Sequence, residues 1–166
     1  MISAKALGYL KTTDDSIFEH IDEDVRSIFA TMVGVDLSRA VKTTTTAVFK
    51  DCITSMVGIA GTFNGVISIN TPRMLSIIIA SQMLGSDLAE VNEDVLDALG
   101  EIANMVGGSF KHHFEKEGHN VNLSIPSVIS GDKYVMSVGP ITDTLSLMFQ
   151  YDQQEFIVNF FIEMEN

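Results

Sequence analysis

The chain has 166 residues, 46% of them apolar, and 22 acidic residues against 10 basic ones give it a net charge of −12. This length suits one domain, residues 1–166, that can bury a full core without disulfides or a metal. The acidic balance argues against nucleic acid and anionic membranes as partners, because binding to phosphate-rich surfaces depends on Lys and Arg.

Two further features bear on the location of the protein. The single cysteine, Cys52, excludes an intrachain disulfide and is expected to be a small buried residue in a strand. No apolar run approaches the roughly 20 residues of a membrane span, and the apolar stretch before Asp14 and Asp15 is too short for a signal peptide. We therefore expect a cytoplasmic protein.

The first predicted element is a helix over residues 17–32. Apolar residues recur there at helical spacing, so that one face of the helix is apolar. Asp15 or Ser16 is a suitable N-cap, and Gly34 is a suitable stop.

A β-rich stretch follows this helix. Four consecutive threonines favour extended structure, and a Gly-Thr-Phe-Asn-Gly sequence is typical of a hairpin turn. The strands expected here span residues 41–49, 53–60 and 66–69. Thr71 is then expected to cap a helix that has Pro72 at its first position and runs to about residue 84.

The second half of the chain predicts a long helix and then strands. Asn92 is a good N-cap for a helix over residues 93–117, and Gly118 supplies its stop. Alternating apolar residues and a hairpin turn at Asp152-Gln153-Gln154 predict strands over residues 121–129, 134–138, 144–151 and 155–164. Helices combined with antiparallel hairpins predict an α+β sandwich of an antiparallel sheet with long helices.

The helix over residues 93–117 has two unlike faces. At about 100° per residue its large apolar side chains share one broad side. The opposite side carries Asp94, Asp97, Glu101, Asn104 and Gly108. Glu101 and Asn104 are three residues apart, so their side chains are neighbours on the exposed face. Asn is a poor residue for the middle of a helix, which makes its presence there unusual.

Glycines inside the same helix are also unusual. Gly100, Gly107 and Gly108 each cost about 0.8–1 kcal/mol of helix stability relative to Ala. Gly100 and Gly107 share a flank with Asn104 and Lys111, and a flank without bulky side chains lets another molecule approach closely. The alternative is that the glycines pack on another helix of the same domain and that the outer face is only solvated.

The sequence Asp97-Ala-Leu-Gly-Glu-Ile-Ala-Asn-Met-Val-Gly-Gly108 resembles the signature helix of the CheC, CheX and FliY family of chemotaxis phosphatases. The downstream sequence Leu123-Ser-Ile-Pro-Ser-Val-Ile-Ser-Gly131 is similar to the strand that follows this helix in the CheX group. The order of elements matches across nearly the whole chain. The resemblance therefore implies a CheC-like fold and a phosphatase activity.

The resemblance also implies the roles of individual residues. In this family the Glu anchors the active-site lysine of a phosphorylated, CheY-like receiver protein, and the Asn orients a water molecule. These roles carry over to Glu101 and Asn104 as the catalytic pair. The other residues expected to contact the receiver are Asp97, Gly100, Gly107, Gly108 and Lys111.

One such site per chain is implied. Relatives of the CheC type have a second Glu-x-x-Asn in the first helix, whereas this chain has no Asn before Asn64. The receiver holds its aspartyl phosphate beside its own Mg²⁺ and lysine, so this chain needs no metal or cofactor of its own. Hydrolysis of the aspartyl phosphate requires a water molecule that is held in line with the phosphorus. A carboxamide can orient this water, and it does not titrate near neutral pH.

Three histidines near the end of the long helix offer an alternative site. His112, His113 and His119 could contribute to a metal centre, but neighbouring helix positions point about 100° apart. We expect them to belong to a solvated helix end.

Two other functions stay open at this point. A non-catalytic adaptor domain of the same fold would bind a receiver or a flagellar-switch partner without hydrolysis. A ligand-binding or structural domain would carry the Glu-x-x-Asn pair only by chance. The long apolar strands at the chain end contain no Pro or Lys, so any edge that they leave open favours pairing with a second copy, and residues 43–48 are a second candidate edge. The resemblance also implies a homodimer that continues the sheet.

Overall fold

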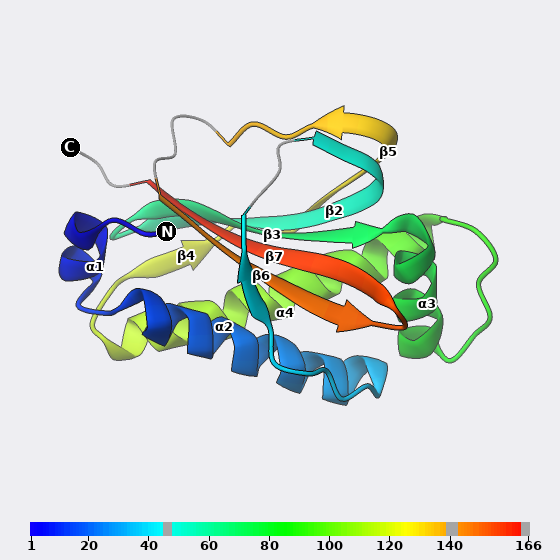
Figure 1. The fold of residues 1–166 in the computed structure, drawn as a ribbon, viewed down its shortest axis with the longest axis horizontal. Helices are drawn as coiled ribbons and strands as arrows, with labels where there is room; N and C mark the ends of the chain where they lie inside the picture. Colours follow the sequence, from blue (N-terminus) through cyan, green and yellow to red (C-terminus); the bar gives the residue numbers. More distant parts are fainter. Residues whose placement is uncertain (45–47, 139–142, 164–166) are drawn as a thin grey trace.

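The computed structural model describes residues 1–44, 48–138 and 143–163, and it is built on one antiparallel sheet (Figure 1). The seven strands are β1 (Val41–Thr43), β2 (Val48–Gly61), β3 (Asn64–Pro72), β4 (Val121–Leu123), β5 (Ser127–Val135), β6 (Asp143–Tyr151) and β7 (Gln154–Glu163). Across the sheet they follow the order β1-β6-β7-β3-β2-β4, and β5 also pairs with β2.

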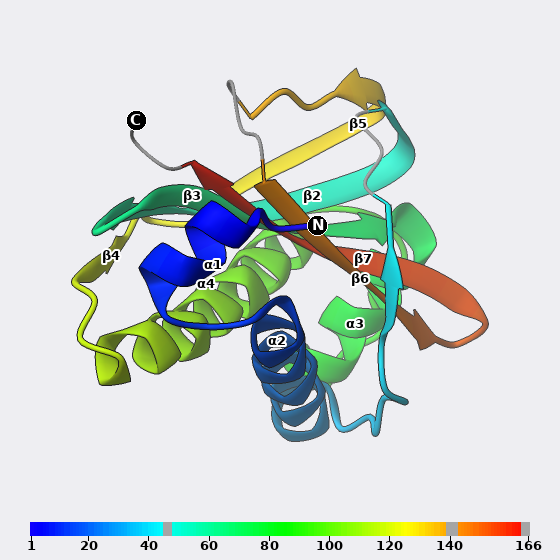
Figure 2. The same cartoon turned by 60° about the vertical axis from the view of Figure 1, so that its left-hand side comes forward.

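Helices pack against the sheet. They are α1 (Ala4–Leu10), α2 (Asp14–Ile28), α3 (Arg73–Leu84) and α4 (Glu93–Lys116), and a π-helical turn, η1 (Phe29–Val33), continues α2. The two longest helices, α2 and α4, lie side by side beneath the sheet, and α3 stands near its end (Figure 1, Figure 2). This architecture confirms the predicted α+β fold, with one antiparallel sheet and long helices.

The helices at the start of the chain begin earlier than predicted. The sequence pattern did not indicate α1, which Ser3 caps by accepting a hydrogen bond from the Ala6 N–H. The N-cap of α2 is Thr13 rather than Asp15 or Ser16, because the Thr13 hydroxyl accepts from the Ser16 N–H at 3.0 Å. The predicted stop is confirmed, since Gly34 has a left-handed φ of 75° directly after η1.

Several strand boundaries also differ from the prediction. Thr71 pairs with Ile53 inside the sheet, so it is a strand residue, and α3 begins after Pro72 without a side-chain cap. The predicted strand over residues 121–129 is divided into β4 and β5 around Pro126, which lacks an N–H for the ladder. Of the predicted strand over 134–138 only the first two residues belong to β5. Residues 45–47 and 164, also predicted as strand, lie outside the described residues.

The core lies between the sheet and the apolar side of α4. The six residues predicted to form that side are all buried: Val95, Leu99, Ile102, Val106, Phe110 and Phe114. The ring of Phe110 packs on Phe160 of β7 with ring centroids 4.5 Å apart. Full burial of each such side chain contributes about 1.5–3 kcal/mol, so this packing fixes which face of α4 is left outside.

A chain of buried hydrogen bonds crosses the sheet. Ser146 donates to Asn159 at 2.7 Å, Asn159 donates to Asn70 at 2.7 Å, and Asn70 donates to Thr54 at 2.6 Å. Unpaired buried polar groups are costly, and a slip of one residue turns each side chain to the other face. These contacts therefore specify the register of β6, β7, β3 and β2.

Of the last two strands, β7 is not an open edge of the sheet, and β6 is covered in its middle. β7 pairs with β6 on one side and with β3 on the other, and β1 covers β6 at residues 146–148. The expectation of an open edge is therefore wrong for β7, whereas β1 leaves the two ends of β6 uncovered among the described residues. Among the described residues, β1, β4 and β5 are outer strands.

Candidate functional site

The helix that carries the predicted site is well defined at both ends. The Asn92 side chain accepts a hydrogen bond from the Val95 N–H at 3.1 Å, as predicted for the N-cap. Glu93 and Asp94 occupy the first turn, where negative charge favours the helix dipole. Gly118 has a φ of 87°, which confirms it as the stop. α4 is thus a rigid 24-residue platform.

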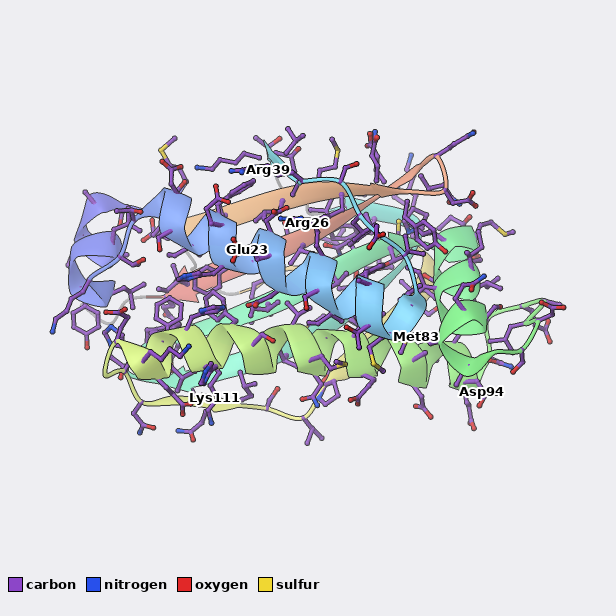
Figure 3. The ribbon with its side chains drawn as sticks, turned by 90° about the horizontal axis from the view of Figure 1, so that it is seen from below. Glu23, Arg26, Arg39, Met83, Asp94 and Lys111 are labelled. Carbon is purple, nitrogen blue, oxygen red and sulfur yellow. The ribbon has the colours of Figure 1, made fainter. Side chains whose placement is uncertain are left out.

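The outer face of α4 presents the predicted pair to solvent. Asp97, Glu101, Asn104 and Gly108 are exposed, and Lys111 is half-buried. Figure 3 labels Asp94 near the start of α4 and Lys111 near its end. Within the described parts of the chain, neither the Glu101 carboxylate nor the Asn104 carboxamide forms a hydrogen bond or ion pair. Both side chains are therefore available to a partner.

Two of the three glycines have a different role from the predicted one. Gly100 and Gly107 are buried, and a Cβ at these positions would stand 3.4 Å from Val128 and 2.7 Å from Val57, respectively. Gly100 and Gly107 let the strands approach α4. The expectation that these two glycines form an open flank for the partner is therefore wrong. A Cβ at Gly108 would meet no atom within 4 Å, and Gly108 alone stays on the outer face.

Asp22 of α2, the helix that was predicted over residues 17–32, has a structural role. Asp22 is buried, where it accepts a hydrogen bond from the Ala40 N–H at 2.7 Å and pairs with Arg26 at 2.9 Å. It holds the segment after η1 against α2.

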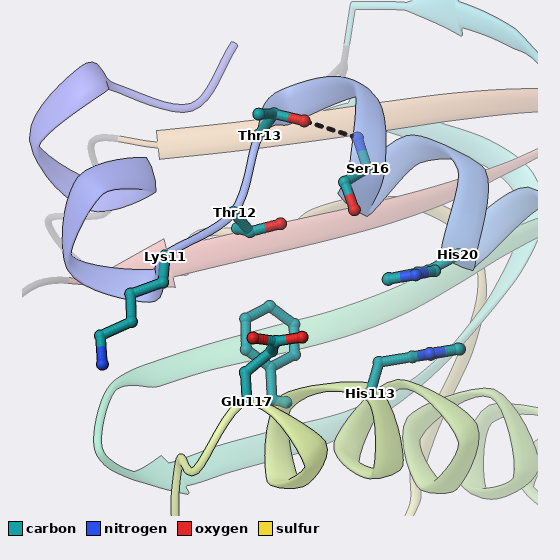
Figure 4. Close-up of a pocket in the computed structure, with 8 residues that line it drawn as sticks. Lys11, Thr12, Thr13, Ser16, His20, His113 and Glu117 are labelled. Carbon is teal, nitrogen blue, oxygen red and sulfur yellow. Dashed lines mark hydrogen bonds between the residues drawn. The ribbon is translucent and has the colours of Figure 1, made fainter.

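A pocket of about 230 Å³ lies between the start of α2 and the end of α4 (Figure 4). Its lining residues are Lys11, Thr12, Thr13, Ser16, His20, His113, Phe114 and Glu117. Neither this pocket nor a second one along α2 is lined by Glu101 or Asn104. The predicted pair therefore stands on an outward helix surface, apart from both hollows.

The histidines near the pocket are not all solvated as predicted. His113 lies 3.0 Å from Asp24 and stacks on His20, with ring centroids 3.9 Å apart and planes 3° from parallel. His119 contacts the Leu10 carbonyl at 3.1 Å, whereas His112 is exposed. Burial, and then the charge of His113, lowers the pKa of His20, whereas burial raises the pKa of Asp24. The sequence could not show these partners, because they come from other helices.

Two other kinds of reactive group were considered among the described residues, a cysteine thiol and a metal-binding cluster. Cys52 is half-buried in β2 rather than fully buried, and burial raises the pKa of its thiol, which disfavours the reactive thiolate. In residues 1–44, 48–138 and 143–163, no group of three or more His, Cys, Asp or Glu could hold a metal ion. None of the helices in these ranges has the length and apolar character needed to cross a membrane.

Sequence comparison identifies a family and a curated relative. Residues 53–152 match the family model of the chemotaxis phosphatase CheX. Over 92 residues the chain is 29% identical to the CheY-P phosphatase CheX of Thermotoga maritima, and this alignment covers 54% of the chain. The chain spans 59% of the length of that relative.

Solved structures show the same fold. The crystal structure of the chemotaxis protein CheX from Desulfovibrio desulfuricans matches with a TM-score of 0.77 at 28% identity, over 89% of this chain and 99% of that one. A chain of the CheX-CheY-BeF3-Mg²⁺ complex from Borrelia burgdorferi matches with a TM-score of 0.75 at 19% identity, over 89% and 98% of the two chains. The family model covers more than half of the chain, including the helix with Glu101 and Asn104, and the chain therefore belongs to the CheX family of chemotaxis phosphatases.

Proposed function

We propose that this protein hydrolyses the aspartyl phosphate of a phosphorylated CheY-like receiver, with one Glu101/Asn104 site per chain. The observation that carries the proposal is the pair itself: an exposed carboxylate and an exposed carboxamide, three residues apart on one face of a rigid helix, with no partner in the described chain. A relative with the same family assignment is a CheY-P phosphatase, and a protein of the same fold forms a complex with CheY.

The shape of the site favours a protein substrate. Sites for small molecules are concave and bury most of the ligand, whereas Glu101 and Asn104 lie outside both pockets. A receiver carries its own cavity, with the phosphoryl group, the Mg²⁺ and a lysine already in place. A projecting helix face can then complete that cavity from outside.

Each residue of the pair has one task in this reaction. The Glu101 carboxylate pairs with the receiver lysine and so sets the position of α4 on the receiver. The Asn104 carboxamide oxygen accepts a hydrogen bond from a water molecule and aligns it with the phosphorus. The water oxygen bonds to phosphorus as the bond to the aspartyl oxygen breaks, and the products are the free aspartate carboxylate and inorganic phosphate.

The catalysis needs no general base on this chain. A carboxamide stays neutral across the physiological pH range, so it acts by orientation and not as a general base. The Mg²⁺ that offsets the developing charge belongs to the receiver. The same site without correct water alignment would bind a receiver but not hydrolyse its phosphate, which is the adaptor function.

The decisive experiment follows phosphate release from phosphorylated CheY-like receivers of the source organism, with and without this protein. We expect acceleration with at least one receiver, and loss of that acceleration in Asn104→Ala. Tight binding of a receiver without any acceleration would establish the adaptor function instead. The cytoplasmic location and the homodimer stay predictions.

A further inference from the structure

One apolar side chain lies exposed beside the proposed site. Ile125 belongs to the short segment between β4 and β5, and it is 84% exposed. Single exposed apolar residues are common on protein surfaces, so exposure alone has no functional meaning. Ile125 differs from an ordinary surface residue in its place next to α4 and in the way that its backbone is held.

Gly100 brings this segment against the helix. A Cβ at Gly100 would lie 3.8 Å from the Cβ of Pro126, so a larger residue there would crowd the segment. Gly100 and Asn104 are four residues apart and are neighbours along one flank of α4. Ile125, which precedes Pro126, therefore lies at the rim of the outer face, on the Asn104 side.

The backbone of Ile125 is held by its neighbours. The Ser124 N–H donates to the Gly58 carbonyl at 2.9 Å, and the Gly58 N–H donates to the Ser124 hydroxyl oxygen at 2.8 Å. The same hydroxyl donates to the Ile125 carbonyl at 2.8 Å. Pro126 further restricts the residue before it to extended conformations. An apolar contact made by such a preorganised residue loses little conformational freedom on binding.

We propose that Ile125 is an apolar docking contact for the receiver. The inference rests on the proposed function, because a receiver that brings its phosphoaspartate to Glu101 and Asn104 also covers the rim beside them. The chemistry that fits Ile125 is a small apolar patch next to the phosphorylation site of the receiver. Covering one exposed Ile side chain increases affinity by about 10-fold or more.

This role predicts a specific kinetic signature. Ile125 touches the receiver surface but not the reacting atoms, so it stabilises the ground-state complex and the transition state equally. The loss of such uniform binding raises KM and leaves kcat unchanged. The loss of Asn104, by contrast, lowers kcat.

The experiment compares Ile125→Ala and Ile125→Asp with Val41→Ala and Val41→Asp. Val41 is also β-branched and 58% exposed, but it lies in β1, at the opposite end of the strand order from β4. We measure the Kd for a receiver loaded with Mg²⁺ and beryllofluoride, a mimic of the phosphoryl group, and the kcat and KM for the phosphorylated receiver. Ile125→Ala is expected to raise Kd and KM about 10-fold, and Ile125→Asp more. The Val41 variants are expected to match the wild type.

The outcomes separate this inference from the proposed function. Unchanged Kd and KM in Ile125→Asp would overturn the docking role and leave the phosphatase assignment intact. A wild type that binds the receiver without hydrolysis would overturn the phosphatase assignment, and the Kd comparison would still decide the role of Ile125. A wild type that binds no receiver would overturn both. A change of association state in Ile125→Asp, with unchanged receiver affinity, would assign the residue to a surface between copies of this chain and overturn the inference. Thermal unfolding of each variant checks that the fold is retained.

Discussion

Gly107 of α4 lies so close to Val57 of β2 that a Cβ at the glycine would stand 2.7 Å from the Val57 Cγ2 atom. Val57 is fully buried, so it has little room to move. The next residue, Gly108, has no neighbour within 4 Å of the same added atom. Two adjacent glycines therefore serve different purposes, close packing at Gly107 and an open outer face at Gly108.

The first prediction compares Gly107→Ala with Gly108→Ala. Both variants gain the same helix propensity, about 0.8–1 kcal/mol. Only Gly107→Ala adds an atom to a filled core, which costs about 1–3 kcal/mol. We expect Gly108→Ala to be more stable than the wild type. Gly107→Ala should be less stable than Gly108→Ala by about 1–3 kcal/mol, the cost of the added core atom. Urea unfolding measures the difference, and equal midpoints would show that the core accommodates the methyl group.

The second prediction concerns Asn104. Asn104→Ala should lower kcat about 10²–10³-fold, which is the usual effect of removing one well-placed polar group from a reaction. Stability should be unchanged or slightly higher, because the position is exposed and Ala is the better helix former. Asn120→Ala is the matched control, since Asn120 is also exposed but lies beyond the end of α4. Phosphate release that is as fast in Asn104→Ala as in the control would remove Asn104 from the mechanism.

The third prediction concerns Glu101. Glu101→Gln keeps the size of the side chain but loses the charge that pairs with the receiver lysine. A hydrogen bond between charged groups contributes about 1.5–3 kcal/mol, so we expect receiver affinity to fall about 10-fold or more. The affinity should also depend less on salt concentration than in the wild type. Asp94→Asn, at the start of the same helix, is the control that should bind almost normally. If the two variants bind equally well, the Glu101 carboxylate has no special partner.

The fourth prediction concerns pH and the stacked histidines between α2 and α4. Burial first, and the charge of His113 second, lower the pKa of His20 in the folded state below its ordinary value of about 6.5. The unfolded chain therefore binds a proton on His20 more readily than the folded chain does. The stability that the neutral His20 contributes is complete above its ordinary pKa of about 6.5. It is lost as the pH falls through the lower folded-state pKa.

Urea unfolding between about pH 7.5 and pH 5.5 tests this sign, because the histidine titration falls in that range. The stability of the wild type should decrease with falling pH, and His20→Phe, which keeps a stacked ring without a titratable nitrogen, should show a shallower decrease. The raised pKa of Asp24 acts in the opposite direction, since stability falls as the pH rises through it. A slope that is the same in both proteins would mean that His20 does not titrate in this range.

The fifth prediction is a homodimer that continues the sheet. Among the described residues, β5 is the longest outer strand, and it carries the exposed side chains of Ile129 and Val135. An exposed strand edge favours pairing with another strand, and a second copy of the same edge closes the symmetry. Sedimentation is expected to give twice the 18.1 kDa mass of one chain. Val135→Lys should weaken the dimer, whereas Val41→Lys in β1 should not. A monomeric wild type that is still active would show that β5 is protected in another way.

The sequence alone was sufficient for the features that depend on nearby residues. The amphipathic pattern of α4 placed its six large apolar residues in the core, and this left Glu101 and Asn104 outside. Asn92 and Gly118 were correctly identified as the ends of the helix, since capping depends on hydrogen bonds within one turn. The hairpin at Asp152 and Gln153 was predictable for the same reason, and both residues have the positive φ that such a turn requires.

Only the tertiary structure decided the features that depend on residues far apart in the chain. Gly107 and Gly108 look alike in the sequence, and their roles differ because Val57 lies behind one of them and solvent behind the other. His113 is next to the exposed His112 in the chain, but α2 supplies His20 and Asp24 as its partners. The sequence does not show that β7 is paired on both sides, because β3, one of its two neighbours, lies far from it in the chain. Periodicity shows which face of an element is apolar, whereas the neighbour on that face is set by the packing of the whole chain.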